Sequence, residues 1–213
     1  MNVQLLSQGS EDWKAARVGS LGASVVHEVM AKTKSSGYSA SRANRMAALV
    51  LERLTGKPVE IFETPSMRRG KELEPIARDM YRLLKQVNVE EVGLFQHPTI
   101  QGTHASPDGL VGDDGMVEIK APEAAAHLET LLTKKVPEKY VLQCLWQMRC
   151  CGRVWNDYVS YHPDFPEPMQ TFIHRIHYDQ AKISEMETEI SKFLTELDAK
   201  VAQLQAQYSE EAV

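Results

Sequence analysis

The chain has 213 residues, 43% of them hydrophobic and 25% charged, which is typical of a globular protein with a sizeable core. No apolar run approaches the ~20 residues of a membrane span, and the first residues lack the basic start and apolar core of a signal peptide, so we expect a cytoplasmic protein without a membrane segment. The net charge of −5 comes entirely from residues 179–213, which carry eight acidic and three basic side chains. The neutral remainder leaves nucleic acid open as a partner, because affinity follows the phosphates contacted rather than the net charge.

The N-terminal segment is predicted to form two short helices, over residues 11–18 and 25–31. Trp13 and Arg17 are four residues apart in the first helix and therefore share a face. Ser24 has the side chain that is preferred at the N-cap of the second helix. Each of the three also fits an ordinary structural role: a packing Trp, a surface Arg and a helix cap.

Two longer helices are predicted next, over residues 40–54 and 64–84, after a basic loop that contains Lys34. The second of them opens on Thr64-Pro65, and proline is favoured in the first turn of a helix. Four of its residues are candidates for chemistry or binding: Met67, Arg68, Arg69 and Glu74.

Residues 106–120 contain the strongest candidate for a site. Two apolar runs flank Asp113-Asp114-Gly115, which predicts a β-hairpin with a three-residue turn and Gly115 in the left-handed conformation. Asp108 would then face Lys120, and Leu110 would face Glu118. Since side chains alternate along a strand, Asp108, Glu118 and Lys120 would project from the same side. A two-residue turn would shift the register by one residue and move Asp108 to the opposite face.

Two carboxylates and an ammonium group on one face can support phosphodiester hydrolysis. Carboxylate oxygens suit Mg²⁺ or Mn²⁺, and a metal-bound water is more acidic than bulk water. Lys120 could orient the resulting hydroxide and stabilise charge on the phosphoryl group. The alternative is an exposed hairpin on which Glu118 and Lys120 form a surface salt bridge, but the Ser-Pro-Asp-Gly segment at 106–109 favours the site.

The remaining elements complete an α/β pattern with a central mixed sheet flanked by helices. Strands are predicted at 89–96, 154–162 and 169–178, helices at 123–132 and 138–151, and a long amphipathic C-terminal helix at about 179–207. We expect residues 1–213 to form a single domain.

Polar residues within these elements allow two further interpretations. Gln143 and Gln147 are four apart on a face separate from the apolar residues, and such an amide stripe predicts a hydrogen-bonding task, with an exposed pair as the alternative. His97 and His104 are isolated from other metal-ligating residues, and we expect neither to take part in a site.

The motif P-D-x(n)-E-x-K, here Pro107-Asp108 and Glu118-Ile119-Lys120, resembles that of the PD-(D/E)xK, restriction-endonuclease-like nucleases. The longer pattern includes Ser106, Lys120-Ala121-Pro122 and W-x-x-x-R-x-G from Trp13. It is similar to the phage lambda exonuclease, or YqaJ-type viral recombinase, family, and it extends from about residue 11 to at least residue 147.

The resemblance implies a role for each matching residue. Asp108, Glu118 and the Ile119 carbonyl would hold Mg²⁺, or alternatively Mn²⁺, with Glu74 assisting and two ions in the site. Lys120 and Gln143 would activate water, and Arg17, Ser24 and Ser106 would hold a 5′-phosphate. Lys34, Met67, Arg68, Arg69 and Trp13 would contact DNA. The sequence departs from the family at Ala126, where a relative has Arg, and at Leu145, where relatives have a second Gln.

The function implied is processive 5′-to-3′ digestion of one strand of linear duplex DNA, which leaves a 3′ tail for recombination by strand annealing. Relatives form a ring-shaped homotrimer and cooperate with a single-strand-annealing protein, in phage- or prophage-encoded systems of the bacterial cytoplasm. The alternatives are a nicking or structure-specific endonuclease, a catalytically silent DNA-binding or assembly module, and a hydrolase of small phosphate esters.

Overall fold

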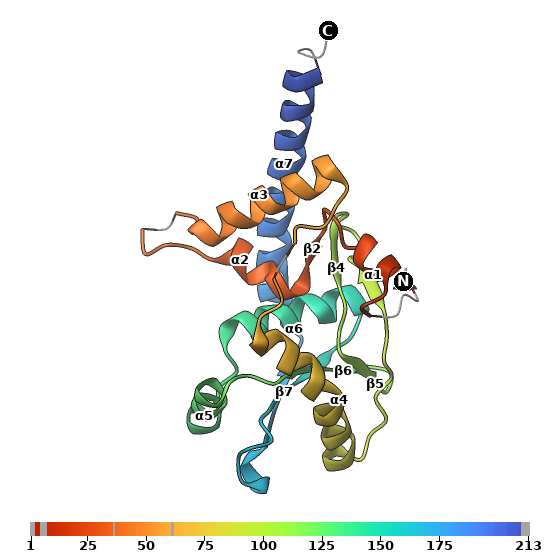
Figure 1. The fold of residues 1–213 in the computed structure, drawn as a ribbon, viewed down its shortest axis with the longest axis vertical. Helices are drawn as coiled ribbons and strands as arrows, with labels where there is room; N and C mark the ends of the chain where they lie inside the picture. The colour runs from red at the N-terminus through yellow and green to blue at the C-terminus, as the bar shows by residue number, and fades with distance from the viewer. Residues whose placement is uncertain (1–2, 5–7, 36, 61, 210–213) are drawn as a thin grey trace.

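Short strands and helices alternate along the chain, and the computed structural model describes residues 3–4, 8–35, 37–60 and 62–209. The strands are β1 (Val3–Gln4), β2 (Leu21–Gly22), β3 (Leu94–Gln96), β4 (Thr103–Ala105), β5 (Gly109–Val111), β6 (Gly115–Lys120), β7 (Trp155–Tyr161) and β8 (Thr171–His177). The helices are α1 (Glu11–Ala15), α2 (Val26–Met30), α3 (Ala40–Thr55), α4 (Pro65–Lys85), α5 (Ala124–Thr133), α6 (Glu138–Cys151) and α7 (Gln180–Ser209), with 3-10 turns η1 (Ala23–Val25) and η2 (Glu167–Met169). This mixed α/β architecture with a long C-terminal helix confirms the predicted fold class (Figure 1).

The predicted mixed sheet has the strand order β5-β6-β7-β8, and a second four-stranded sheet has the order β1-β3-β4-β2. In each sheet one pair is parallel, β6 with β7 and β2 with β4. The strands of the second sheet span only two or three residues, too few to show a period of two in the sequence. The strand predicted at 89–96 is therefore shorter than expected, and Glu90 forms only an isolated bridge to Leu110.

Helix α6 lies between the two sheets. It packs against β3 and β4 of one sheet and against β7 and β8 of the other, and it crosses the middle of the molecule in Figure 1. Helix α4 packs against β6 and β7, and its Tyr81 donates a hydrogen bond to the buried Asp157 at 2.8 Å. Met116 belongs to the apolar cluster around α6, whereas Val117 and Ile119 belong to the cluster around α4. Strand β6, which carries the E-x-K motif, is therefore covered on both faces.

The hairpin of β5 and β6 has the predicted loop length but a different register. Val111 pairs with Gly115 and Leu110 with Met116, so the pairing of Leu110 with Glu118 was wrong by two residues. The three-residue loop is 112–114, and Gly112 has the positive φ of 56°. Gly115 is instead a strand residue beneath Trp155, where a Cβ would overlap the indole ring. Because the shift is even, every side chain keeps its predicted face.

The predicted cap at Ser24 was also wrong. Ser24 lies within the 3-10 turn η1, and α2 begins two residues later, with Val25 at its N-cap position and no side-chain cap hydrogen bond. The Ser24 side chain is exposed and is therefore available for another role.

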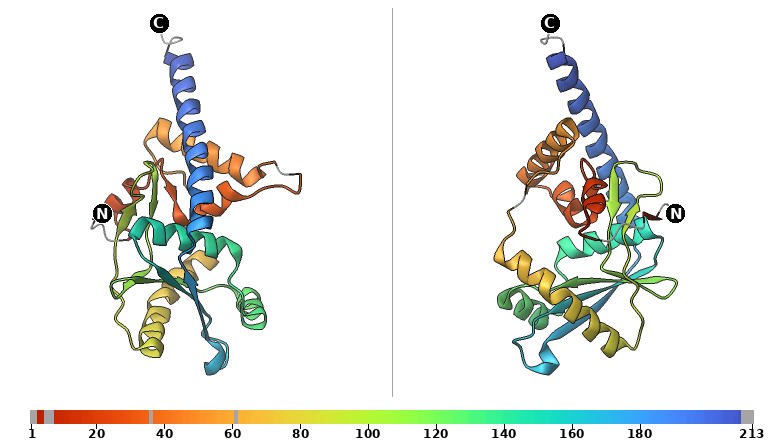
Figure 2. Two further views of the ribbon diagram at one scale, coloured as in Figure 1. Left: turned by 180° about the vertical axis from the view of Figure 1, so that it is seen from behind. Right: turned by 45° about the vertical axis from the view of Figure 1, so that its right-hand side comes forward.

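The C-terminal helix α7 packs against α2, α3 and α6 over its first part, and its last turns extend beyond α3 (Figures 1 and 2). Among the residues that the structure describes, no helix is long and apolar enough to cross a membrane.

Candidate active site

Glu118 on β6 is the centre of a buried polar cluster. Its side chain is 1% exposed. Oε1 accepts hydrogen bonds from Lys120 Nζ and, at 2.5 Å, from Gln143 Nε2, and Oε2 accepts one from Gln147 Nε2 at 2.5 Å. The two glutamines of α6 therefore have the hydrogen-bonding task that their spacing predicted. The alternatives of an exposed glutamine pair and of a surface salt bridge were wrong.

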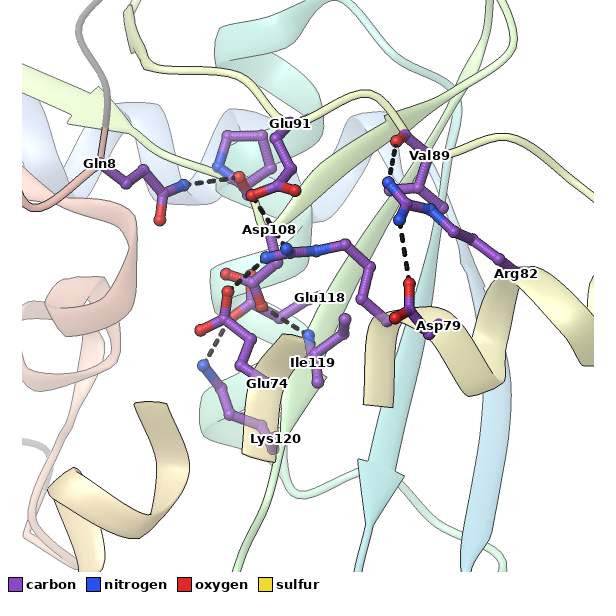
Figure 3. Close-up of polar contacts among 12 residues, drawn as sticks. Gln8, Glu74, Asp79, Arg82, Val89, Glu91, Asp108, Glu118, Ile119 and Lys120 are labelled. Carbon is purple, nitrogen blue, oxygen red and sulfur yellow. Dashed lines mark hydrogen bonds and ion pairs between the residues drawn. The ribbon is translucent and has the colours of Figure 1, made fainter. Parts of the chain in front are cut away.

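Asp108 lies immediately before β5 and turns its carboxylate toward β6. The Ile119 N–H donates to Asp108 Oδ2 at 2.6 Å. Burial, reinforced by the negative charges of Glu118 and Glu74, raises the pKa of Asp108 well above its ordinary value, against the opposing effect of Lys120. Figure 3 shows the carboxyl groups of Asp108, Glu118 and Glu74 gathered around Lys120. The even shift in register thus left the predicted side chains together.

Glu74 reaches the same cluster from α4. Its Oε1 accepts a hydrogen bond from Arg78 at 2.5 Å, and Arg78 also pairs with Glu91 at 2.9 Å. Burial raises the pKa of Glu74, an effect that Arg78 opposes and Glu118 reinforces. Within the described ranges, no three His, Cys, Asp or Glu side chains are arranged to hold a metal ion. The role of Glu74 as a further ligand therefore stays a prediction.

Lys120 carries the positive charge of the cluster. Burial alone would lower its pKa, but the Glu118 and Asp108 carboxylates outweigh burial and raise the pKa above its ordinary value. The side chain therefore carries its positive charge at neutral pH. Its Nζ also lies 5.4 Å from the centre of the Tyr140 ring, over the ring face.

The oxygen atoms of this cluster suit a hard divalent cation. Two carboxylates, from Asp108 and Glu118, and the Ile119 carbonyl are the kind of donor that Mg²⁺ or Mn²⁺ prefers. Burial raises the pKa values of Asp108 and Glu74, and repulsion between the neighbouring carboxylates raises them further. A divalent cation would relieve this repulsion, so the residues present fit the predicted metal.

A pocket of about 390 Å³ opens beside the cluster. Its lining includes Met67 and Glu74 of α4, Lys120 of β6 and Tyr140 of α6. The Met67 side chain is 44% exposed, so an apolar side chain faces solvent next to the candidate catalytic groups. The pocket therefore connects Glu74 and Lys120 of the cluster with the exposed surface of α4.

The predicted DNA-contacting arginines of α4 differ from each other. Arg68 is exposed and pairs weakly with Glu63 at 3.5 Å, so it is available to a phosphate. Arg69 donates from Nη1 to the Ala121 and Pro122 carbonyls at 3.2 and 3.0 Å. It therefore ties α4 to the segment that follows β6, and this structural role was missed in the sequence.

Two of the three predicted phosphate-binding residues, Arg17 and Ser106, contact Trp13. The Arg17 guanidinium stacks over the Trp13 ring, 4.0 Å from its centre, and Trp13 Nε1 donates to Ser106 Oγ at 3.1 Å. One indole therefore contacts both residues, Arg17 over its face and Ser106 at its Nε1. Ser106 lies two residues before Asp108 in the chain. Ser24 is exposed in η1, and Lys34 lies in an exposed turn.

Comparison of the sequence with known protein families assigns the chain that carries these residues to a family. A model of the YqaJ-like viral recombinase domain matches residues 12–154. The chain belongs to this family.

Solved structures are similar to this YqaJ-like chain over almost its whole length. Two crystal structures of an alkaline exonuclease from Laribacter hongkongensis, LHK-Exo, one of them in complex with dAMP, are 48% identical to it, with a TM-score of 0.89 over 95% of this chain and 100% of theirs. A phage related exonuclease from Haemophilus somnus 129PT shares the fold, with a TM-score of 0.72 and 12% identity over 87% of this chain and 96% of that one. No curated protein matches the chain. These matches confirm the predicted family and the prediction that the enzyme is a nuclease.

Two residues around the YqaJ-like site were missed as site residues in the sequence. Gln147 was grouped with Gln143 only as a stripe, and Asn156 was not considered. Asn156 Nδ2 donates to Gln147 Oε1 at 2.9 Å, and both side chains are fully buried. The adjacent polar residues Asn156 and Asp157 within the predicted strand at 154–162 were the signal that could have found this support for Glu118.

Proposed function

We propose that this protein is a divalent-metal-dependent exonuclease that digests one strand of linear duplex DNA from its 5′ end and leaves a 3′ single strand. The observation that carries the proposal is the buried cluster of Asp108, Glu118 and Lys120 beside an open pocket. The LHK-Exo relative is an alkaline exonuclease and binds dAMP, a mononucleotide of the kind that stepwise digestion releases.

The side chains of the cluster have separate roles in hydrolysis. Asp108, Glu118 and the Ile119 carbonyl hold the metal, which when bound supplies an acidic water and neutralises charge on the scissile phosphate. We assign this role to Mg²⁺, with Mn²⁺ as a substitute and a second ion assisted by Glu74. Lys120, protonated and held by Glu118, stabilises the negative charge that develops on the phosphoryl oxygens.

Gln143 orients the attacking water. Its Nε2 is occupied by Glu118, so its Oε1 is the atom that can accept a hydrogen bond from water. The helix α6 fixes this amide from a buried position, which keeps the acceptor in place between turnovers.

The terminal 5′-phosphate is held by Arg17, Ser24 and Ser106. A guanidinium can donate two parallel hydrogen bonds to a phosphate, and stacking on Trp13 restricts its orientation. Because Ser106 is two residues from Asp108, a phosphate held there lies close to the metal ligands. This pocket would favour an end over an internal position.

The duplex is contacted on the surface around α4. Met67 would separate the terminal base pair at the mouth of the pocket. Three basic side chains would contact the DNA: Arg68, Arg69 and Lys34. We further propose that the chain acts as one nuclease domain. Three copies would form a ring in the bacterial cytoplasm and cooperate with an annealing protein of a phage-type recombination system.

End-labelled linear duplex with Mg²⁺ tests the proposal. We expect 5′-phosphorylated ends to be degraded faster than 5′-hydroxyl ends, closed circular duplex to resist, and Lys120→Ala to lose at least 100-fold in rate. Release of nucleotides from the 3′ end would contradict the polarity, and cleavage of closed circles would favour an endonuclease.

A further inference from the structure

Strands β2 and β4 form a small cradle near Arg17. The two strands run parallel, and Gly22 pairs with His104. Gly22 has no side chain, and a Cβ at this position would lie 3.2 Å from His104 Nε2 and 3.7 Å from Arg17 Nη2. Two nitrogen atoms therefore converge on the space above Gly22.

The His104 nitrogen in the cradle lacks a partner. The ring is 2% exposed, Nδ1 lies 2.9 Å from Ser20 Oγ, and Nε2 is buried without a hydrogen bond to any residue that the structure describes. Buried polar atoms are almost always paired in folded proteins, so an orphaned one calls for a physical reason. A missing ligand atom supplies such a reason.

The Arg17 guanidinium also lacks a counter-charge in the described part of the chain, where no carboxylate lies within ion-pair distance of it. Glu52 is the acid whose charge acts on Arg17, but its two oxygens accept hydrogen bonds from the Gly19 and Val59 N–H groups. Arg17 itself stacks on Trp13. A cationic group and an unpaired ring nitrogen thus share one site without an anion.

We propose that an oxygen of the terminal 5′-phosphate lies above Gly22 and accepts hydrogen bonds from His104 Nε2–H and from Arg17. This inference rests on the proposed function and adds His104 and Gly22 to its phosphate pocket. In this proposal the Ser20 hydroxyl donates to Nδ1, so that the ring proton lies on Nε2 and the neutral imidazole is a donor.

The electrostatics of the cradle agree with a neutral donor. Burial, together with the neighbouring Arg17, lowers the pKa of His104 to about 3. A neutral ring does not repel the guanidinium, and it can still donate one hydrogen bond to an anion. The arrangement therefore recognises a phosphate with one positive charge and one neutral donor.

The position of the cradle suits the end of a strand. Trp13 connects Arg17 to Ser106, and Ser106 is at most about 7 Å along the chain from Asp108. The phosphate above Gly22 and the phosphate at the metal would then be neighbours in one strand. Removal of one nucleotide at a time requires this spacing.

Binding of short duplexes without catalysis tests the cradle. Duplexes that carry a 3′ fluorescein and either a 5′-phosphate or a 5′-hydroxyl are titrated in EDTA, and the ratio of the two Kd values is compared among variants by fluorescence anisotropy. Gly22→Ala leaves both donors in place and fills the cradle, and the extended backbone at Gly22 (φ −80°, ψ 150°) accepts alanine. We expect Gly22→Ala and His104→Ala each to lower the preference for phosphate about 10-fold.

Two further variants make the result specific. His104→Gln places an amide donor near the position of Nε2 and should restore part of the preference. His174→Gln, an exposed histidine of β8 in the other sheet, should leave the ratio unchanged. Thermal melts show whether each variant is folded, and if His104→Ala does not fold, Gly22→Ala decides.

The outcomes separate this inference from the proposed function. One outcome would reject the cradle and leave the proposed function standing. In that outcome the wild type prefers phosphorylated ends and Arg17→Ala loses the preference. The variants Gly22→Ala, His104→Gln and His104→Ala would all keep the preference of the wild type. If the wild type binds both ends equally, the 5′-phosphate pocket of the proposed function fails and the cradle fails with it.

Discussion

At the scale of single residues, the cluster around Glu118 brings three acidic side chains together, with Lys120 paired to Glu118 and Arg78 paired to Glu74. Asp108, Glu118 and Glu74 approach one another in a buried region, and Lys120 is the ammonium among them. Removing one partner of a buried ion pair costs more than the pair itself contributes, because an uncompensated charge is left behind. Removal of the Lys120 ammonium should therefore destabilise the folded protein.

Lys120→Met should lower the free energy of unfolding by about 2 kcal/mol, a value reduced from the fully buried case because the Lys120 side chain is 26% exposed. Urea titration measures it, and added Mg²⁺ should recover part of the loss, since a bound cation replaces the ammonium charge. The matched control is Lys71→Met. The ion pair of Lys71 with Glu63 is exposed, so this substitution should change the free energy of unfolding by less than about 0.5 kcal/mol. Equal effects of the two variants would contradict a buried charge cluster.

His97 titrates far from its ordinary range for a structural reason. Its Nδ1 accepts hydrogen bonds from the Thr99 and Ile100 N–H groups, so the neutral ring carries its proton on Nε2, toward Glu187. Burial and then Arg149 lower the pKa of His97 to about 4, against the opposing effect of Glu187. The ring also stacks on Trp146 of α6.

This shift predicts a pH dependence of stability. Between pH 6.5 and 4 the unfolded chain binds a proton at His97 that the folded chain does not. The contribution of neutral His97 to the free energy of unfolding is therefore complete above pH 6.5 and is lost as the pH falls toward 4. His97→Asn keeps an acceptor in the place of Nδ1 but does not titrate. Urea titrations at several pH values from 7 to 5 give the free energy of unfolding as a function of pH. Its slope against pH should be smaller in the variant than in the wild type, by up to about 1.4 kcal/mol per pH unit. Parallel curves would contradict the lowered pKa.

At the scale of elements, the hairpin of β5 and β6 shows why register is harder to predict than the identity of a strand. The turn residues at 112–115 fit two three-residue loops, 112–114 and 113–115, and a change from one to the other shifts the cross-strand partners by two residues. Trp155 decides between them, because its ring lies over position 115, and it comes from β7, about forty residues later. The face on which each side chain lies was predictable, because both loops leave it unchanged. This was sufficient to place Asp108 and Glu118 on the same side of the hairpin.

Two glycine substitutions in this hairpin separate backbone conformation from packing. Gly115→Ala places a Cβ in the Trp155 ring and should cost about 3 kcal/mol, because overpacked positions force neighbouring groups to move. Gly112→Asn should cost less than about 1 kcal/mol, since Gly112 has open space and Asn tolerates positive φ. Both are measured by urea unfolding, and a milder effect at position 115 than at 112 would overturn the observed register.

The long helices were predictable, whereas the second sheet was not. The bounds of α6 are as predicted, because apolar spacing, an ending Gly152 and a length of 14 residues all agree. Strands β1, β2 and β4 depend on pairing between segments far apart in the chain, which no local pattern reports. The metal-side residues follow from a motif, but His104 meets Gly22 only through the pairing of β2 with β4, and Asn156 meets Gln147 only because β7 packs against α6.

At the scale of the whole molecule, the charge distribution limits how the protein can hold DNA. The acidic excess lies in residues 179–213, much of it on α7, whose end extends away from the body. The body itself is neutral, so in the proposed function its attraction for a duplex would come from local groups such as Arg68 and Lys34. Long tracts of digestion are then difficult to explain by electrostatic attraction alone, since attraction weakens steeply with salt.

Enclosure by the proposed ring predicts a specific salt dependence. Raising NaCl from 50 to 200 mM should slow the first encounter with a linear duplex several-fold or more, but it should not shorten the tract digested in each encounter, because an enclosed strand cannot diffuse away. The measurement is the length of product formed on end-labelled duplex after a heparin trap is added with Mg²⁺. Heparin removes free enzyme, so each product reports one encounter. Tracts that shorten in proportion to the loss in encounter rate would mean that contacts on an open surface hold the DNA, and the ring would be rejected.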